Sequence, residues 1–73
     1  MPTKEPLTSD TFGSRTGLGA KRKAIKNWRQ KAKATYGEKY SHWWRAKNPE
    51  RYVSGPSGHA IAYVVAKPYC RNG

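Results

Sequence analysis

The clearest periodic pattern lies in the middle of the chain, in residues 20–37. Its apolar positions recur at spacings of three, four and four residues: Ile25, Trp28, Ala32 and Tyr36. This spacing places them on one face of an α-helix, and Leu18 extends the same face backwards. Gly37 follows at the place typical of a helix C-cap, and Thr16 or Ser14 precedes as a candidate N-cap. The pattern therefore predicts one amphipathic helix.

A weaker helical pattern follows in residues 38–47, EKYSHWWRAK. The positions that repeat are Tyr40, Trp43, Trp44 and Lys47. The spacing predicts a short second helix that ends at Asn48-Pro49, because the residue before a proline disfavours helical angles. Asn48-Pro49-Glu50 also has the composition of a cap followed by one further helical turn.

The C-terminal third has the alternation and turn residues of a β-hairpin. Residues 59–66, HAIAYVVA, are rich in β-branched and aromatic side chains and are bounded by Gly58 and Pro68. Residues 54–58, SGPSG, predict a loop, so residues 51–53 are the nearest candidate partner strand. A two-stranded hairpin is marginal by itself, and we expect it to pack on the apolar face of the helix.

Residues 1–19 hold two prolines, three glycines and scattered Ser and Thr, and predict a flexible tail. Phe12 is an exception, and we expect it to dock on the domain, with exposure to a partner as the alternative. The predicted organisation is a flexible tail over 1–19, a small domain over 20–67 and a frayed C-terminus over 68–73. The fold class is α+β, with one basic helix, a short second helix and a C-terminal β-hairpin.

The charge of the chain indicates that this small domain binds a partner. Fifteen Lys and Arg face four acidic residues, and the formal net charge is +11. A charge this large on a small body repels itself, which favours an acidic partner: nucleic acid, an acidic protein surface or an anionic membrane. The cations concentrate on the central helix, where one ridge and its neighbours form the candidate partner-binding set: Lys21, Arg22, Lys23, Lys26, Arg29 and Lys33.

The tryptophans supply the other candidate partner-binding side chains. With few aliphatic residues available, we expect Trp28 and one of Trp43 and Trp44 to lie in the core. The other lies on the surface, where it would stack on single-stranded bases or anchor a protein interface. The thin apolar face argues against a helix that lies on a membrane.

Catalysis and metal binding have little support in the sequence. The four carboxylates are scattered, and His42, His59 and Cys70 have none of the spacings of a zinc site. We therefore expect no enzymatic activity, no metal and no cofactor. A single cysteine and the lack of a long apolar run fit a cytoplasmic monomer with no membrane span.

The length, the basicity and the tryptophan-rich cationic middle of residues 1–73 resemble the small transcription regulators encoded by lytic Xanthomonas phages. The resemblance is one of size and character, without a shared motif. It implies a non-enzymatic factor that acts in the host bacterial cytoplasm and binds RNA polymerase at the N-terminal part of β′, near the β flap. Such a factor impairs promoter recognition and promotes antitermination. The alternative is a general nucleic-acid-binding protein.

Two shorter stretches have other likenesses. Residues 44–52, WRAKNPERY, are similar to a linker-type repeat found around some phage HNH nucleases, although the metal-binding histidines of such nucleases are missing. Residues 21–23, KRK, have the composition of a nuclear import signal or a ribosomal-protein arm, a pattern that is common in basic chains.

Overall fold

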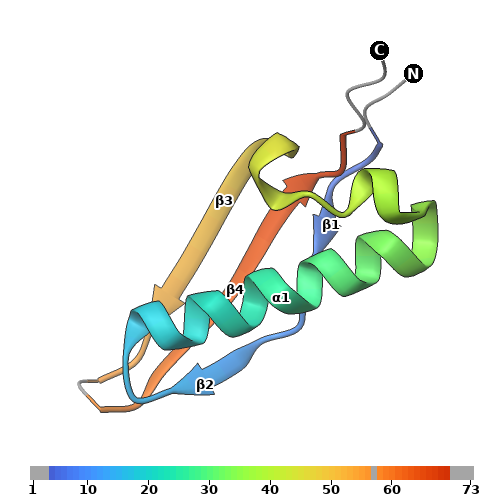
Figure 1. The fold of residues 1–73 in the computed structure, drawn as a ribbon. Helices are drawn as coiled ribbons and strands as arrows, with labels where there is room; N and C mark the ends of the chain where they lie inside the picture. The colour runs from blue at the N-terminus through green and yellow to red at the C-terminus, as the bar shows by residue number, and fades with distance from the viewer. Residues whose placement is uncertain (1–3, 57, 70–73) are drawn as a thin grey trace.

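In the computed structural model, one long helix lies across one face of an antiparallel β-sheet (Figure 1). The structure describes residues 4–56 and 58–69. In chain order the elements are β1 (Leu7–Thr8), β2 (Phe12–Ser14), α1 (Gly17–Tyr36), the 3₁₀ turns η1 (Glu38–Tyr40) and η2 (Trp43–Arg45), β3 (Lys47–Ser54) and β4 (Ala60–Lys67). The fold class is α+β, as predicted.

Strand β4 is the centre of the sheet. β1 and β2 pair with it one after the other along one edge, and β3 pairs along the other edge, all antiparallel. The predicted hairpin is confirmed: its first strand is longer than the predicted 51–53, and its second is shifted by one residue from the predicted 59–66. Side chains alternate along β4, and those buried beneath the helix are Ala60, Ala62, Val64 and Ala66.

The helix contacts the sheet through a row of residues at every fourth position. Its fully buried members are Ala20, Ala24, Trp28 and Ala32. Three alanines let the helix backbone approach the sheet closely, and Trp28 fills the space between them and β4. The predicted apolar face was therefore partly wrong: Ile25 and Tyr36 are only half-buried, and Leu18 is 56% exposed. The pattern of large side chains gave too little weight to alanine.

Both predicted caps of the helix are confirmed. The Thr16 side chain accepts a hydrogen bond from the backbone N–H of Gly19 at 3.0 Å. At the other end, the N–H of Gly37 donates to the Lys33 carbonyl, and Gly37 has a φ of 103°. Side-chain-bearing residues rarely adopt that angle, so glycine suits this position.

The flexible tail predicted for residues 1–19 needs correction. β1 and β2 occupy an edge of β4 that would otherwise leave its backbone groups unpaired, and the helix already begins at Gly17. Phe12 packs against the core, which confirms its predicted docking. Residues 1–3 lie outside the described part of the chain.

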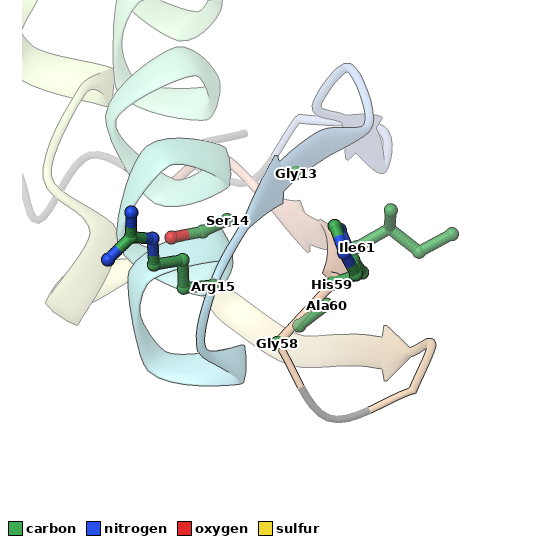
Figure 2. A pocket seen from close by; sticks show the side chains of 7 residues that line it. All are labelled: Gly13, Ser14, Arg15, Gly58, His59, Ala60 and Ile61. Carbon is green, nitrogen blue, oxygen red and sulfur yellow. The ribbon is translucent and has the colours of Figure 1, made fainter.

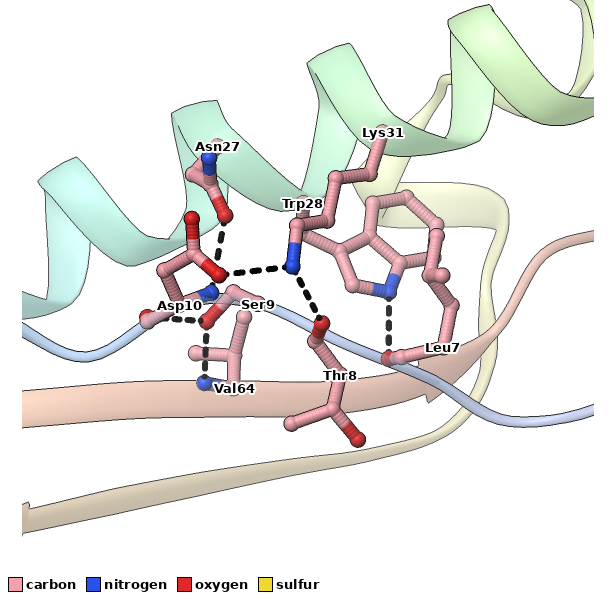
Figure 3. Close-up of polar contacts among 8 residues, drawn as sticks. All are labelled: Leu7, Thr8, Ser9, Asp10, Asn27, Trp28, Lys31 and Val64. Carbon is pink, nitrogen blue, oxygen red and sulfur yellow. Dashed lines mark hydrogen bonds and ion pairs between the residues drawn. The ribbon is translucent and has the colours of Figure 1, made fainter.

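Side chains fasten the connection between β1 and β2 to both the helix and β4 (Figure 3). The Ser9 hydroxyl accepts a hydrogen bond from the Val64 N–H at 2.9 Å, and the Ser9 N–H donates to the Val64 carbonyl. On the helix, the Asn27 amide oxygen accepts from the Asp10 N–H, and Lys31 forms an ion pair with the Asp10 carboxylate at 2.8 Å. The segment is therefore held at a β-bulge, where Ser9 to Thr11 oppose two residues of β4.

The second helix predicted over residues 38–47 is also wrong. The segment forms the separate turns η1 and η2, since its Tyr, Ser, His and Trp residues are weak helix formers. The helical turn predicted at Asn48-Pro49-Glu50 is instead an irregular part of β3, where the register shifts and Asn48 has a φ of 52°. Pairing with β4 satisfies more backbone groups than one isolated helical turn.

The frayed C-terminus predicted for 68–73 needs correction at Pro68 and Tyr69, the two of its residues that the structure describes. Pro68 is fully buried, and its carbonyl accepts a hydrogen bond from the Lys4 N–H at 2.8 Å. The ordered unit therefore extends beyond the predicted limits of 20–67 at both ends. Cys70 lies outside the described residues. None of the described helices has the length and apolar character needed to cross a membrane.

Candidate polyanion-binding face

A row of four cations lies on the face of α1 that points away from the sheet. We call Arg22, Lys26, Arg29 and Lys33 the basic ridge. All four are exposed, and with 1.5 Å of rise per residue the row is about 17 Å long. Lys26, Arg29 and Lys33 follow the buried Ala24 by two, five and nine positions, and Arg22 precedes it by two. At 3.6 residues per turn, each of these spacings points to the side of the helix opposite the buried row.

The ridge is not neutralised by the rest of the described chain. Among residues 4–56 and 58–69, the ion pair between Lys31 and Asp10 is the one salt bridge within 4 Å, and Lys31 is not a ridge member. Arg29 is the ridge member with an internal hydrogen bond, from its Nε to the Ser41 carbonyl at 3.3 Å. Neighbouring cations on the ridge repel one another at helical spacing. This repulsion makes the free ridge receptive to an anion.

The two neighbours that the sequence grouped with the ridge have different surroundings. Lys23 is exposed, and its Nζ donates to the Gly13 carbonyl at 3.1 Å, which ties it to β2. Lys21 is half-buried on the flank of the helix. Both therefore border the ridge, and neither lies along it.

The structure shows which of the two adjacent tryptophans lies against the core and which lies on the surface, a choice that the sequence left open. Trp43 is half-buried and meets Trp28 edge-on, with ring centroids 5.2 Å apart and an interplanar angle of 80°. Trp44 is 68% exposed. The Arg29 guanidinium lies 5.7 Å from the Trp44 ring centroid, so the exposed indole adjoins the ridge. Trp43 is a core residue, and Trp44 is the surface aromatic.

A shallow hollow of about 270 Å³ lies between the ridge and turn η1. Its lining residues are Lys26, Arg29, Gln30, Lys33, Glu38 and Ser41. The sequence did not identify Glu38 and Ser41, because their approach depends on how η1 folds back against the helix. Gln30 was also missed, although the helical spacing that placed the ridge could have found it. The mixed lining offers hydrogen-bond donors beside the cations, with one carboxylate at the rim.

A second hollow, of about 540 Å³, lies at the loop end of the hairpin between β2 and β4 (Figure 2). Arg15 and His59 line it together with Ile61 and small residues, and their side chains extend toward opposite sides of the view. Among the described residues, no carboxylate lines this hollow. The two polar side chains do not converge on a point, so the hollow lacks the geometry of an acid–base pair.

Groups of three potential metal ligands are also missing from the described residues, which include His42 and His59 but not Cys70. His42 lies instead against Trp44, with ring centroids 4.9 Å apart. The surface that stands out chemically is therefore the basic ridge with Trp44. Comparison of the chain with protein-family models, with curated protein sequences and with solved structures gives no match.

Proposed function

We propose that the protein is a non-enzymatic nucleic-acid-binding protein and that the basic ridge, with Trp44 beside it, is its binding face. The observation that carries this proposal is the exposed indole of Trp44 next to Arg29, at the edge of a row of cations that form no salt bridge with the acids of the described chain. A cationic row attracts phosphates, and an exposed aromatic ring stacks on an unpaired base. The two features complement different parts of the same ligand.

Four ridge cations predict a measurable salt dependence. Neutralising four phosphates gives a slope of log affinity against log salt of about −2.8 for a single strand and about −3.6 for a duplex. Raising the salt from 50 to 200 mM should therefore weaken binding by roughly 50- to 150-fold. Trp44 contributes with single strands alone, because the bases of a duplex are already stacked.

Fluorescence anisotropy with a labelled oligo(dT) and with a duplex of equal length tests the proposal. The ridge variant replaces Arg22, Lys26 and Lys33 by Gln, since these three have no internal hydrogen bond or ion pair among the described residues. We expect its salt slope to become shallower by about 2 for the single strand. A matched control replaces the exposed cations Arg15, Lys39 and Arg45 by Gln, with the same loss of charge.

The control separates a binding face from general charge attraction. If the control variant loses as much slope as the ridge variant, the ridge is not the binding face. Trp44→Ala should weaken single-strand binding and leave duplex binding nearly unchanged. An equal loss for both ligands would remove base stacking from the proposal.

A second proposal is that this face binds bacterial RNA polymerase, as a phage-encoded regulator that inhibits promoter recognition and promotes antitermination in the host cytoplasm. Trp44 favours it, because an exposed tryptophan beside an arginine is typical of a protein-interface hot spot. Capture of purified polymerase after nuclease treatment tests it, with a β′ N-terminal fragment as competitor. We expect retention by the wild type and loss with Trp44→Ala. Failure of the wild type to retain polymerase would contradict this proposal and leave the first intact.

A further inference from the structure

The helix covers one face of the sheet and leaves the other face open (Figure 1). Alternation along β4 places Ile61, Tyr63, Val65 and Lys67 on this open face. In the register of the hairpin, Tyr52 lies opposite Tyr63 and Glu50 opposite Val65, so both β3 residues share that face. None of these residues belongs to the buried core, and Ile61 is 47% exposed. The face is remote from the basic ridge, because the helix and the sheet lie between them.

Two tyrosines form a rigid aromatic stack at the centre of the open face. The ring centroids of Tyr52 and Tyr63 are 4.8 Å apart, and their planes differ by 18°. The Tyr52 hydroxyl donates a hydrogen bond to the Glu50 carboxylate, which fixes the ring from a second side. Tyr52 lies on the edge strand and is 43% exposed. A planar group can therefore extend the stack, and little side-chain freedom remains to be lost when it does.

Two lysines lie at the end of the same face. Lys47 and Lys67 are direct partners in the β3–β4 register, which places two like charges opposite each other. Such a pair is unfavourable in a free sheet. The Lys47 ammonium also lies 4.5 Å from the Tyr69 ring centroid. An anion between the two lysines would be attracted by both and would offset their mutual repulsion. Lys67 lies four positions after Tyr63 on β4, so the lysine pair is about 13 Å from the tyrosine stack.

We infer that the open face of the sheet is a second nucleic-acid-binding site, specific for single strands. An unpaired base stacks on Tyr52, and backbone phosphates bind between Lys47 and Lys67. The site lies beyond the proposed function of the ridge and does not depend on it. A duplex does not fit this chemistry, since its bases have no free face to offer Tyr52.

Charge argues for a nucleic acid over a second copy of the chain. Two open faces placed together would bring two lysine pairs into contact, in molecules that each carry a formal charge of +11. A polyanion instead neutralises the same lysines. The one carboxylate among the residues placed on this face by the hairpin register, Glu50, accepts the hydrogen bond of Tyr52.

The test uses the ridge variant (Arg22, Lys26 and Lys33 to Gln) as background, so that the two faces are separated. Amide chemical shifts are followed by two-dimensional NMR while unlabelled oligo(dT) is added, and affinity is measured by anisotropy. We expect the largest shifts on β3 and β4. Tyr52→Ala should weaken oligo(dT) binding by about 5- to 150-fold, as expected for the loss of one base stack. Tyr52→Phe, which keeps the ring and loses only the bond to Glu50, should lose much less affinity than Tyr52→Ala.

Replacing Lys47 and Lys67 by Gln should make the salt slope shallower by about 1.4. Circular dichroism verifies that each variant is folded, and the lysine variant provides a second test should Tyr52→Ala unfold. Shifts confined to α1 and Trp44, or equal affinity of Tyr52→Ala and its parent, would overturn the inference and leave the ridge proposal standing. Concentration-dependent shifts on β3 and β4 without oligo(dT) would assign the face to a second copy and equally overturn it.

Discussion

Replacing Trp28 by alanine removes the largest side chain of the core and its principal polar contact with the N-terminal segment. Trp28 has no exposed surface. Its indole Nε1 donates a hydrogen bond to the Leu7 carbonyl at 3.0 Å and a longer one to the Ala66 carbonyl at 3.3 Å. One residue of the helix thus joins β1 and β4, and it also packs against Trp43.

The expected loss is large compared with the stability of so small a domain. Truncation of a buried tryptophan to alanine costs about 3–5 kcal/mol. Loss of the donor to the two carbonyls adds about 1 kcal/mol. At about 0.05–0.15 kcal/mol per residue, a chain of 73 residues has a free energy of unfolding of about 4–11 kcal/mol. Trp28→Ala should therefore lose all of its stability if the wild type lies at the lower end of this range, and about half of it at the upper end.

Urea and thermal unfolding followed by far-ultraviolet circular dichroism measure this loss. Trp28→Phe separates its parts, because phenylalanine keeps most of the ring and loses the N–H donor. We expect Trp28→Phe to cost about 1–3 kcal/mol, a fall in Tm of roughly 5–20 °C. Trp44→Ala is the matched control and should change stability by less than about 0.5 kcal/mol. A Trp28→Ala protein as stable as this control would refute the packing described for α1.

Three smaller changes test the local features of the fold by the same unfolding measurements or by titration. Ser9→Ala leaves the buried backbone N–H on β4 without its acceptor and should cost about 1–3 kcal/mol, whereas Ser9→Thr should recover part of the loss. Gly37→Ala should cost about 1–3 kcal/mol through backbone strain at a φ of 103°, although no atom lies within 4 Å of the added carbon. Gly13→Ala, at a position without a positive φ and with ordinary contacts, should be nearly neutral, and an equal loss at both glycines would contradict the strain. The hydrogen bond to Glu50 raises the pKa of Tyr52 above 10.0, so its contribution to stability is complete below pH 10 and is lost as the pH rises through the raised pKa. Glu50→Ala should lower the tyrosinate titration of Tyr52 toward its ordinary value, and an unchanged titration by NMR would show that the bond is not formed in solution.

The elements that the sequence predicts well are those with a local cause. The α-helix follows from a periodic pattern with caps at Thr16 and Gly37, and the hairpin follows from alternation on both sides of a Gly- and Pro-rich loop. In each case the residues that decide the structure lie within a few positions of one another. Local physics is then sufficient to identify the element.

The N-terminal strands have no such local cause. β1 and β2 are two and three residues long, which is too short for a periodic pattern, and they form because β4 offers an edge 46 to 59 residues away in the chain. Pairing with the opposite edge of β4 likewise makes Asn48-Pro49-Glu50 part of β3, where the sequence predicted a helical turn. Local composition gave the wrong answer at both places because a distant partner determined the structure.

The candidate site also has some features that follow from local sequence and others that depend on distant contacts. Exposure of the basic ridge follows from helical geometry and was predictable once the buried face was known. The different environments of Trp43 and Trp44 were not predictable, because they depend on whether a ring reaches Trp28 across the fold. The open face of the sheet was accessible to sequence reasoning, since alternation from Ile61 to Lys67 gathers its residues on one side.

The placement of the few acids explains why the ridge remains available, and it leads to a final prediction. Asp10 pairs with Lys31 and Glu50 accepts from Tyr52, both away from the ridge, while Glu38 lines only the hollow beside it. The free protein therefore retains the repulsion of a formal +11, which salt screens. We expect Tm to rise with added sodium chloride in the free protein, and the ridge variant to show a higher Tm at low salt and a smaller rise.

Binding should respond to salt in the opposite direction, because counterion release weakens with added salt. At a free oligonucleotide concentration 100 times its Kd, binding adds about 2.7 kcal/mol to stability, and this gain should shrink as the salt is raised. Differential scanning fluorimetry with and without oligo(dT) measures both trends on one sample. A Tm of the free protein that is indifferent to salt would mean that the cations are already compensated within the fold. In that case repulsion along the ridge is not what makes it receptive to a polyanion.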